Sequence, residues 1–262
     1  MIDQSFSSQS TQVEPLVSVI IVTFNSDPYI LDCLNALQSQ AYQAVEIIIY
    51  DNASSDRTIS FIQTNFPAVK LMIGKTNLGF AAANNLAANE AKGEFLAFLN
   101  PDTIAEPNWL HPLIKTVTTN TTIGAVTPQI VFAHDPARVN TCGNTVHLSG
   151  ITYCQQYDQP LSKGEPYTVS AVSGAAFVIS QKLFEALGGF EERFFMYYED
   201  TDLSLRIHCA GLLCTAVPAS IVRHVYKPAF SAQKIFYLER NRYLSLFSLI
   251  SWQLFLFMMP SL

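Results

Sequence analysis

Hydrophobic and polar residues alternate along the first hundred positions in a pattern that predicts strands separated by helices. Four short runs of β-branched and aliphatic residues are typical of buried strands: 17–24, 45–50, 69–73 and 95–99. Helical spacing predicts helices after the first three runs: 29–40, 56–65 and 81–91. Pro28 suits the start of the first helix, and Ser54 or Ser55 is expected to cap the second. This alternation predicts a Rossmann-like, mostly parallel sheet with helices on both faces.

The pattern is less regular beyond residue 106. A helix is expected at 107–119 and strands are expected at 123–132 and 169–180, followed by short strand-like pieces at 217–218 and 221–225. Residues 133–166 show little periodicity and are interpreted as an insertion or lid. Gly174 indicates close approach of a ligand or another backbone, and a bulge explains it equally well.

The strand expected at 95–99 is followed by polar residues that could bind a ligand. Pro101 has no amide proton for a sheet ladder, so the strand at 95–99 stops there and leaves Asp102 at its carboxyl end. Thr23, Asn25 and Asp51 follow neighbouring strands, and ligands bind at this edge of open α/β sheets. Asp102 could therefore face a metal-bound phosphate. Taken alone, Asn-Pro-Asp-Thr is better explained as a turn.

Composition narrows the class of protein. Hydrophobic residues make up 49% of the chain and charged residues 14%, and the net charge of −6 gives no reason to expect nucleic acid. Five cysteines without Cys-x-x-Cys spacing indicate neither a disulfide framework nor a zinc cluster, which fits a reducing cytosol. The absence of Gly-x-Gly-x-x-Gly after the first strand and of a P-loop disfavours dinucleotide dehydrogenases and P-loop NTPases.

The two ends of the chain differ in character. Residues 1–14 are polar, lack the features of a signal peptide and are expected to be a disordered lead-in to a domain at 15–243. Residues 244–262 contain no charged side chain, so they could cross a bilayer or lie on it, and the abrupt end is compatible with a fragment. A helix packed on the domain is the alternative. Four basic residues suited to anionic headgroups precede this segment: Lys227, Lys234, Arg240 and Arg242.

Two further positions have both a structural and a chemical interpretation. Asp200 or Thr201 could cap a helix whose Asp202 pairs with Arg206, or Asp200 or Glu199 could be a general base beside aromatic walls that raise its pKa. His224 would complete a metal site with Asp102. As a lone histidine in an apolar strand, it would more often be a core residue.

Taken in order, seven motifs resemble the family 2 glycosyltransferases, which are inverting enzymes of the GT-A fold, and within them the bacterial rhamnosyltransferase-like branch. The motifs are Val-Ser-Val-Ile-Ile-Val-Thr-Phe-Asn from position 17, Asp51-Asn-Ala-Ser-Ser-Asp56, Asn77-Leu-Gly-Phe80 with Asn85, Asn100-Pro-Asp102, Gly174-Ala, Glu199-Asp200-x-Asp202-Leu-x-x-Arg206, and His224. The resemblance runs from about position 17 to position 242.

The resemblance implies a role for each matched position. The nucleoside would be held by Thr23, Asn25 and Asp51, beside a nucleotide pocket formed by Asn77, Gly79, Phe80 and Asn85. Asp102, with His224, would bind Mg²⁺ or Mn²⁺ on the diphosphate, and Asp200 would be the catalytic base. Asn100, Gly174, Asp202 and Arg206 are expected to line the same site. Asn100 departs from the aspartate of many relatives, which would weaken the hold on the metal.

The implied reaction is inverting transfer of a hexosyl or deoxyhexosyl group from dTDP-rhamnose or a UDP-sugar to a saccharide, lipid-linked at the cytoplasmic membrane surface, in polysaccharide assembly. One base suffices for such a single displacement. A nucleotidyltransferase or pyrophosphorylase is a rival, although residues 23–29 lack the Gly-rich basic loop expected of it. The other rival is an inactive nucleotide-sugar-binding protein, which Asn100 favours.

Overall fold

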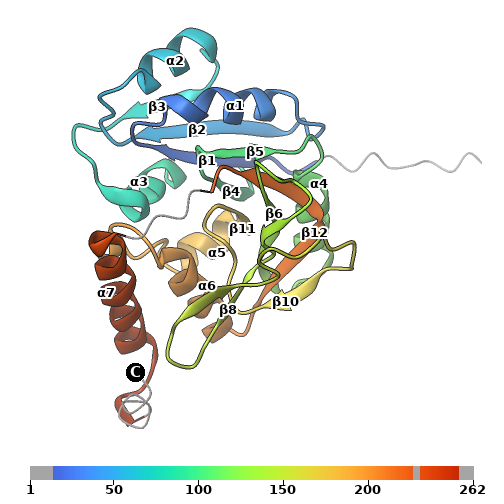
Figure 1. Ribbon diagram of the computed structural model, residues 1–262, viewed down its shortest axis with the longest axis vertical. Coiled ribbons are helices and arrows are strands. Elements are labelled where there is room, and N and C mark those ends of the chain that lie inside the picture. Colours follow the sequence, from blue (N-terminus) through green and yellow to red (C-terminus); the bar gives the residue numbers. More distant parts are fainter. Residues whose placement is uncertain (1–13, 227–230, 254–262) are drawn as a thin grey trace, which may run out of the picture.

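A ten-stranded sheet runs through the protein, with helices packed against both of its faces (Figure 1). The structure is a computed structural model that describes residues 14–226 and 231–253. The strand order is β10-β12-β6-β11-β4-β1-β2-β3, with β5 paired to β12 and β7 paired to β6, while β8 and β9 form a separate hairpin.

The strands are β1 Val17–Thr23, β2 Val45–Asp51, β3 Lys70–Ile73, β4 Phe95–Leu99, β5 Thr103–Ala105, β6 Ile123–Phe132, β7 Val139–Thr141, β8 Asn144–Val146, β9 Thr152–Cys154, β10 Tyr167–Val169, β11 Ala176–Ser180 and β12 Leu213–His224. The helices are α1 Asp27–Gln38, α2 Thr58–Asn65, α3 Gly79–Ala88, α4 Leu110–Thr119, α5 Gln181–Ala186, the 3-10 helix η1 Glu192–Phe194, α6 Glu199–Cys209 and α7 Ala232–Leu249.

The order of the first strands creates a crevice for a ligand. β1, β2 and β3 lie side by side and parallel, and the chain then returns through α3 to place β4 on the other side of β1, again parallel. The connections after β1 and β4 therefore leave the sheet in opposite directions at the same edge. In open α/β sheets this switch point, at the carboxyl ends of the strands, is where ligands bind.

Alternate residues of the strands feed two cores, one on each face of the sheet. In β1, Val19 and Ile21 pack with α1 and α4, whereas Ile20 points to the opposite side, where α3, α5 and α6 cover the sheet. β4 is buried along its whole length, because it lies between β1 and β11 with helices above and below. The continuous apolar run at 95–99 follows from burial on both faces.

Most of the expected elements are confirmed, and the deviations have local causes. The expected strand at 169–180 is two strands, because the chain breaks around Gly174 so that β10 pairs with β12 and β11 pairs with β4 and β6. β11 runs antiparallel to both of its neighbours. The strand-like pieces near 217 and 221 belong to one strand, β12, whose register shifts between Val217 and Ile221.

Both predicted caps are wrong. Neither Ser54 nor Ser55 caps α2; Ser54 instead donates to the carboxylate of Asp51, and Asp56 accepts from the N–H of Thr58 at the helix start. The residue before α6 is Tyr198, in the left-handed conformation and without a side-chain cap bond. The predicted ion pair between Asp202 and Arg206 is present, at 2.8 Å.

The carboxyl-terminal helix α7 crosses the expected domain boundary between 243 and 244 without a break. Its inner side is buried at Asn241, Ser245 and Leu246, and its outer side exposes Phe247 to 62%. Within the described residues, none of the helices has both the length and the apolar character that crossing a bilayer requires. Residues 1–13, Lys227 and residues 254–262, on which part of the terminal predictions fell, lie outside the described residues.

Candidate active site

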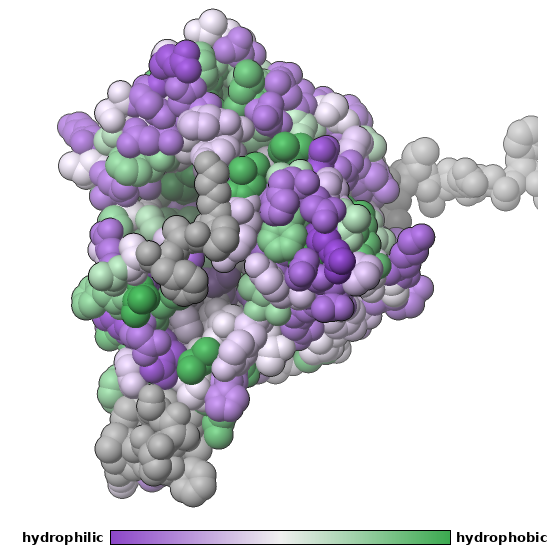
Figure 2. Space-filling model, in the orientation of Figure 1, coloured by the Kyte–Doolittle hydropathy of each residue, from purple (hydrophilic) through white to green (hydrophobic). Residues whose placement is uncertain are grey.

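A cavity of about 600 Å³ opens at the carboxyl ends of β1 and β4. Figure 2 shows this face of the molecule hollowed between the half that carries β1 to β3 and the half that carries α6 and α7. Ten of the residues singled out from the sequence line it: Asn25, Asn77, Gly79, Phe80, Asn100, Asp102, Gly174, Glu199, Asp200 and His224. Segments up to 199 positions apart in the chain thus meet at the switch point of the sheet.

Asp200 is held in the cavity wall by backbone donors from two elements. The N–H of Gly174 donates to Oδ2 at 2.7 Å, and the N–H of Thr201 donates to Oδ1 at 2.7 Å. Burial raises the pKa of the Asp200 carboxyl, and these hydrogen bonds oppose the rise because they favour the ionised form. The carboxylate is therefore fixed in orientation and partly buried in the cavity wall, which suits a proton acceptor.

Glu199 lies beside Asp200 in a different environment. Its side chain is 6% exposed, and Oε2 has no hydrogen-bond partner among the described residues. Burial, together with the neighbouring charge of Asp200, raises the pKa of Glu199 to about 8. Of the two carboxyls, Asp200 is better placed to ionise, since it has two N–H donors, and Glu199 is better placed to keep a proton.

Asp102 and His224 form a second pair across the cavity. Antiparallel pairing of β5 with β12 sets His224 opposite Thr103, which brings His224 Nε2 to 3.3 Å from Asp102 Oδ2. The other ring nitrogen, Nδ1, lies 3.2 Å from Asn140 Oδ1. An amide oxygen only accepts, so Nδ1 can donate to Asn140, and Nε2 is the ring nitrogen that faces Asp102.

This pair fits a divalent cation bound together with a diphosphate. Among residues 14–226 and 231–253, three or more His, Cys, Asp and Glu side chains do not gather in a group that could hold a metal ion by themselves. Mg²⁺-like ions at phosphate sites use one or two carboxylates plus substrate oxygens, so one carboxylate and one imidazole are a sufficient protein share. Asn100 borders the same cavity without adding a charge.

Thr23 and Asp51 do not reach the cavity in this structure. Both side chains are fully buried, and Thr23 Oγ1 donates to Asp51 Oδ2 at 2.7 Å. Asp51 also accepts from the N–H and the hydroxyl of Ser54, which in turn accepts from the N–H of Asn25 at 2.8 Å. Their observed contacts hold together the loops after β1 and β2, while the predicted contact with the nucleoside stays a prediction.

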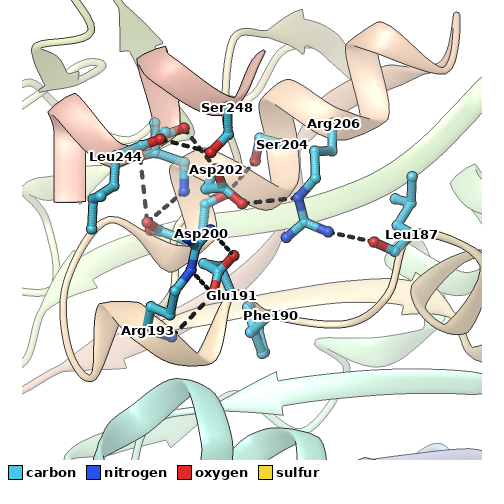
Figure 3. A network of polar contacts seen from close by, with 12 residues as sticks. Leu187, Phe190, Glu191, Arg193, Asp200, Asp202, Ser204, Arg206, Leu244 and Ser248 are labelled. Atoms are coloured by element: carbon cyan, nitrogen blue, oxygen red, sulfur yellow. Dashed lines mark hydrogen bonds and ion pairs between the residues drawn. The ribbon is translucent and has the colours of Figure 1, made fainter.

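Asn85, Asp202 and Arg206 also lie away from the cavity. Asn85 exchanges hydrogen bonds with the backbone of Phe190. Asp202 and Arg206 belong to a polar network on the other side of α6, where Arg206 also donates to the carbonyl of Leu187 (Figure 3). The motif forms the expected helical ion pair, but the pair does not line the cavity.

Several cavity residues were missed in the sequence. Asn140, Asn144, Thr152 and Cys154 come from β7 to β9, in the stretch that lacks periodicity, and Tyr226 follows β12. No local signal marks them, because they line the cavity only when these segments, distant in the chain, come together in the fold. The aromatic residues Tyr197 and Tyr198 do form a wall beside the two carboxyls, as expected.

Comparison with solved structures defines the class of fold. The structure matches the crystal structure of GalNAc-T7 with UDP, GalNAc and Mn²⁺ at a TM-score of 0.74 and 20% identity, covering 90% of this chain and 48% of that one. It matches the mannosyltransferase PcManGT from Pyrobaculum calidifontis in complex with GDP-Man and Mn²⁺ at a TM-score of 0.66 and 20% identity, covering 90% and 64%. The expected GT-A fold is confirmed.

Sequence comparison gives the family. The model of "Glycosyl transferase family 2" matches residues 18–188, and the chain belongs to this family. Over 217 residues it is 30% identical to the O-antigen biosynthesis protein RfbC of Myxococcus xanthus, covering 77% of this chain but only 17% of that protein. It is 25% identical over 232 residues to the N-acetylglucosaminyl-diphospho-decaprenol L-rhamnosyltransferase of Mycobacterium tuberculosis, covering 80% of this chain and 76% of that protein. The expected resemblance to rhamnosyltransferases is confirmed.

Proposed function

We propose that the chain transfers a sugar from a nucleotide-sugar donor to a saccharide hydroxyl, with inversion, and that Asp200 is the general base. One observation carries the proposal. A carboxylate fixed by two backbone N–H groups, Asp200, faces the same cavity as the Asp102–His224 pair, so a proton acceptor and a diphosphate anchor share one space. Family membership supports the reaction class.

The donor would lie across the switch point of the sheet. Its nucleotide occupies the side formed by Asn25, Asn77, Gly79 and Phe80, which offers amide groups and an aromatic face. Asp102 and His224 would hold a divalent cation, Mg²⁺ or Mn²⁺, which would stabilise the charge on the leaving diphosphate. Both structural neighbours named above were solved with Mn²⁺.

The acceptor hydroxyl approaches from the side of α6. Asp200 accepts its proton as the oxygen attacks the anomeric carbon, and the two N–H donors keep the carboxylate aimed during that transfer. Neutral Glu199 avoids a second negative charge beside the base, because burial holds its proton at neutral pH. A single displacement from one face inverts the configuration.

We infer the substrates from the relatives and the surface of α7. The relative named as an L-rhamnosyltransferase acting on N-acetylglucosaminyl-diphospho-decaprenol supports dTDP-rhamnose as the donor, with a UDP-sugar second, and a lipid-linked saccharide as acceptor. Exposed Phe236 and Phe247 on α7 and Trp252 just beyond its end, with the basic residues that precede 244, support peripheral attachment at the inner face of the cell membrane. The catalytic domain would then extend through α7.

The test is a turnover assay with dTDP-rhamnose or UDP-sugars, Mn²⁺ and a prenyl-diphosphate-linked N-acetylglucosamine. Release of nucleoside diphosphate and a product of inverted anomeric configuration, determined by NMR, are expected. The Asp200→Asn variant should lose transfer by at least about 1,000-fold while still binding nucleoside diphosphate. Release of pyrophosphate would identify a pyrophosphorylase, and donor binding without turnover would identify an inactive binding protein.

A further inference from the structure

The segment that leads into α6 has an unusual backbone. Phe195, Tyr197 and Tyr198 all have positive φ angles, 63°, 68° and 77°, although none of them is glycine. Side chains disfavour this left-handed conformation, so it persists only where surrounding contacts impose it. Because Glu199 and Asp200 follow immediately, the path of this segment sets where both carboxyls lie.

One residue of α7 makes three polar contacts with the backbone of this segment and of Phe194 before it. Asn241 is fully buried, and its Nδ2 lies within hydrogen-bond distance of the carbonyl oxygens of Phe194, Met196 and Tyr197, at 3.0, 2.9 and 2.7 Å. The amide therefore binds the peptide carbonyls on both sides of the first left-handed turn. A segment relaxed to ordinary φ angles would point these carbonyls elsewhere.

Arg240 fixes the orientation of that amide. Its Nε donates to Asn241 Oδ1 at 2.9 Å, which turns the NH₂ group of Asn241 toward the segment. Its Nη2 donates to the carbonyl oxygens of Arg193 and Phe194, at 2.8 and 2.7 Å. The two side chains together satisfy the carbonyls of four of the five residues from 193 to 197.

The segment is also held from the opposite side. The N–H of Phe80, in the first turn of α3, donates to the carbonyl of Phe195 at 2.6 Å, and the hydroxyl of Tyr198 donates to the carbonyl of Gly150. It is thus clamped between α3, the β8–β9 hairpin and α7. Of these, α7 contributes two polar side chains, Asn241 and Arg240, that bind the backbone of residues 193–197.

We infer that Asn241, with its amide oriented by Arg240, is a positioning residue for the transfer reaction. It acts by holding residues 195–198 in the left-handed path that sets Asp200 against Gly174. This inference rests on the proposed role of Asp200 as base. It gives α7 a part in turnover that is separate from any contact with lipid.

The chain provides a matched control one helical turn further along α7. Ser245 is also fully buried, and its hydroxyl donates to Asp202 Oδ1 at 2.7 Å, on the side of α6 that faces away from the cavity. Ser245→Ala therefore weakens the docking of α7 without removing a contact to 195–198. If α7 only stabilises the fold, Asn241→Ala and Ser245→Ala should lower kcat by the same factor.

The experiment compares the kcat and the affinity for nucleoside diphosphate of the full chain and its variants, with folding checked by thermal unfolding. For Asn241→Ala we expect kcat to fall about 30- to 100-fold, because a displacement of about 1 Å costs about 100-fold, with nucleotide affinity within about threefold of wild type. Ser245→Ala should keep kcat within about twofold although its Tm falls. If Asn241→Ala does not fold, Arg240→Met takes its place. This substitution, at a half-buried site, removes the guanidinium that orients the Asn241 amide, and it should lower kcat about 10-fold.

The double variant separates this inference from the base assignment. If Asn241 acts through Asp200, adding Asn241→Ala to Asp200→Asn should cause no further loss, since groups that act as a unit are not additive. Wild-type kcat in folded Asn241→Ala or in Arg240→Met, or an equal loss in Ser245→Ala, would overturn the positioning role. Wild-type turnover in Asp200→Asn would instead overturn the base assignment.

Discussion

Gly174 and Asp200 touch without a side chain between them: the N–H of Gly174 lies 2.7 Å from Asp200 Oδ2. A Cβ at position 174 would lie 3.1 Å from that oxygen and 3.3 Å from the carboxyl carbon, which is tighter than ordinary contact. The missing side chain is therefore what lets the backbone donate to the carboxylate. Residues 170–175 lie between β10 and β11, outside both strands, and this is where the N–H of Gly174 reaches the cavity.

Replacing Gly174 by Ala should displace Asp200 by a few tenths of an ångström and lower kcat about 10-fold, with little change in nucleotide affinity. Steady-state kinetics and calorimetric titration with nucleoside diphosphate measure the two quantities. Gly164→Ala is the control, because its Cβ would meet only Ser162 Oγ, at 3.4 Å. Unchanged kcat in Gly174→Ala would show that the contact does not position the base.

Asn140→Ala should weaken metal binding although Asn140 is not itself a ligand. The loss of its acceptor frees the His224 ring to change tautomer and orientation, and such partners of metal-bound histidines are worth about 10- to 100-fold in affinity. The concentration of Mn²⁺ that gives half-maximal turnover should rise by that factor, with normal activity at saturating Mn²⁺. Asn65→Ala, a surface amide on α2, is the control, and an unchanged Mn²⁺ requirement in Asn140→Ala would contradict the assignment.

Glu199 makes folding stability depend on pH. Because burial raises its pKa to about 8 from an ordinary value near 4.5, the folded state holds a proton that the unfolded chain releases between these values. The stabilisation is complete below about pH 4.5 and is lost as the pH rises toward 8, by at most about 1.4 kcal/mol per pH unit for one proton. The free energy of unfolding, measured from pH 5 to 8, should therefore fall more steeply with pH in wild type than in Glu199→Gln. Parallel pH profiles would mean that Glu199 ionises normally.

Asp51→Ala should destabilise the protein by about 2–4 kcal/mol, because it leaves the buried hydroxyl of Thr23 and the N–H of Ser54 without their acceptor. Urea denaturation measures the loss. Asp27→Ala, which breaks an ion pair with an arginine that is 72% exposed, should cost less than about 1 kcal/mol. Near-normal stability combined with a raised donor KM would show that Asp51 serves the nucleoside and not the loop.

The parallel part of the sheet follows from local sequence. The runs that form β1, β2 and β4 are apolar because helices cover both faces, and this burial is visible in composition alone. Gly174 also signalled a close approach, and the group that approaches it in this structure is the carboxylate of Asp200. Burial of a strand and close packing against a glycine could therefore be predicted from single positions in the sequence.

Contacts between distant polar residues left no such trace. Asn140 and Asn241 are ordinary amides in sequence, and each gains its role from a partner more than forty positions away. The uncharged segment that begins at 244 illustrates the same limit. Its hydropathy depends on residue types alone, which do not show whether a side chain packs against the rest of the domain. On the same helix, α7, polar Asn241 is buried against the backbone of residues 194–197 while apolar Phe247 faces outward.

Gly79 lies against Phe195 so closely that a Cβ would overlap its carbonyl, and the next N–H along the chain donates to that same oxygen. The start of α3 and the segment that precedes Asp200 are therefore joined at one peptide group. A shift in either of them must be passed to the other or must break this hydrogen bond. Under the proposed function, binding of the donor nucleotide and alignment of Asp200 would therefore be linked through this one peptide group.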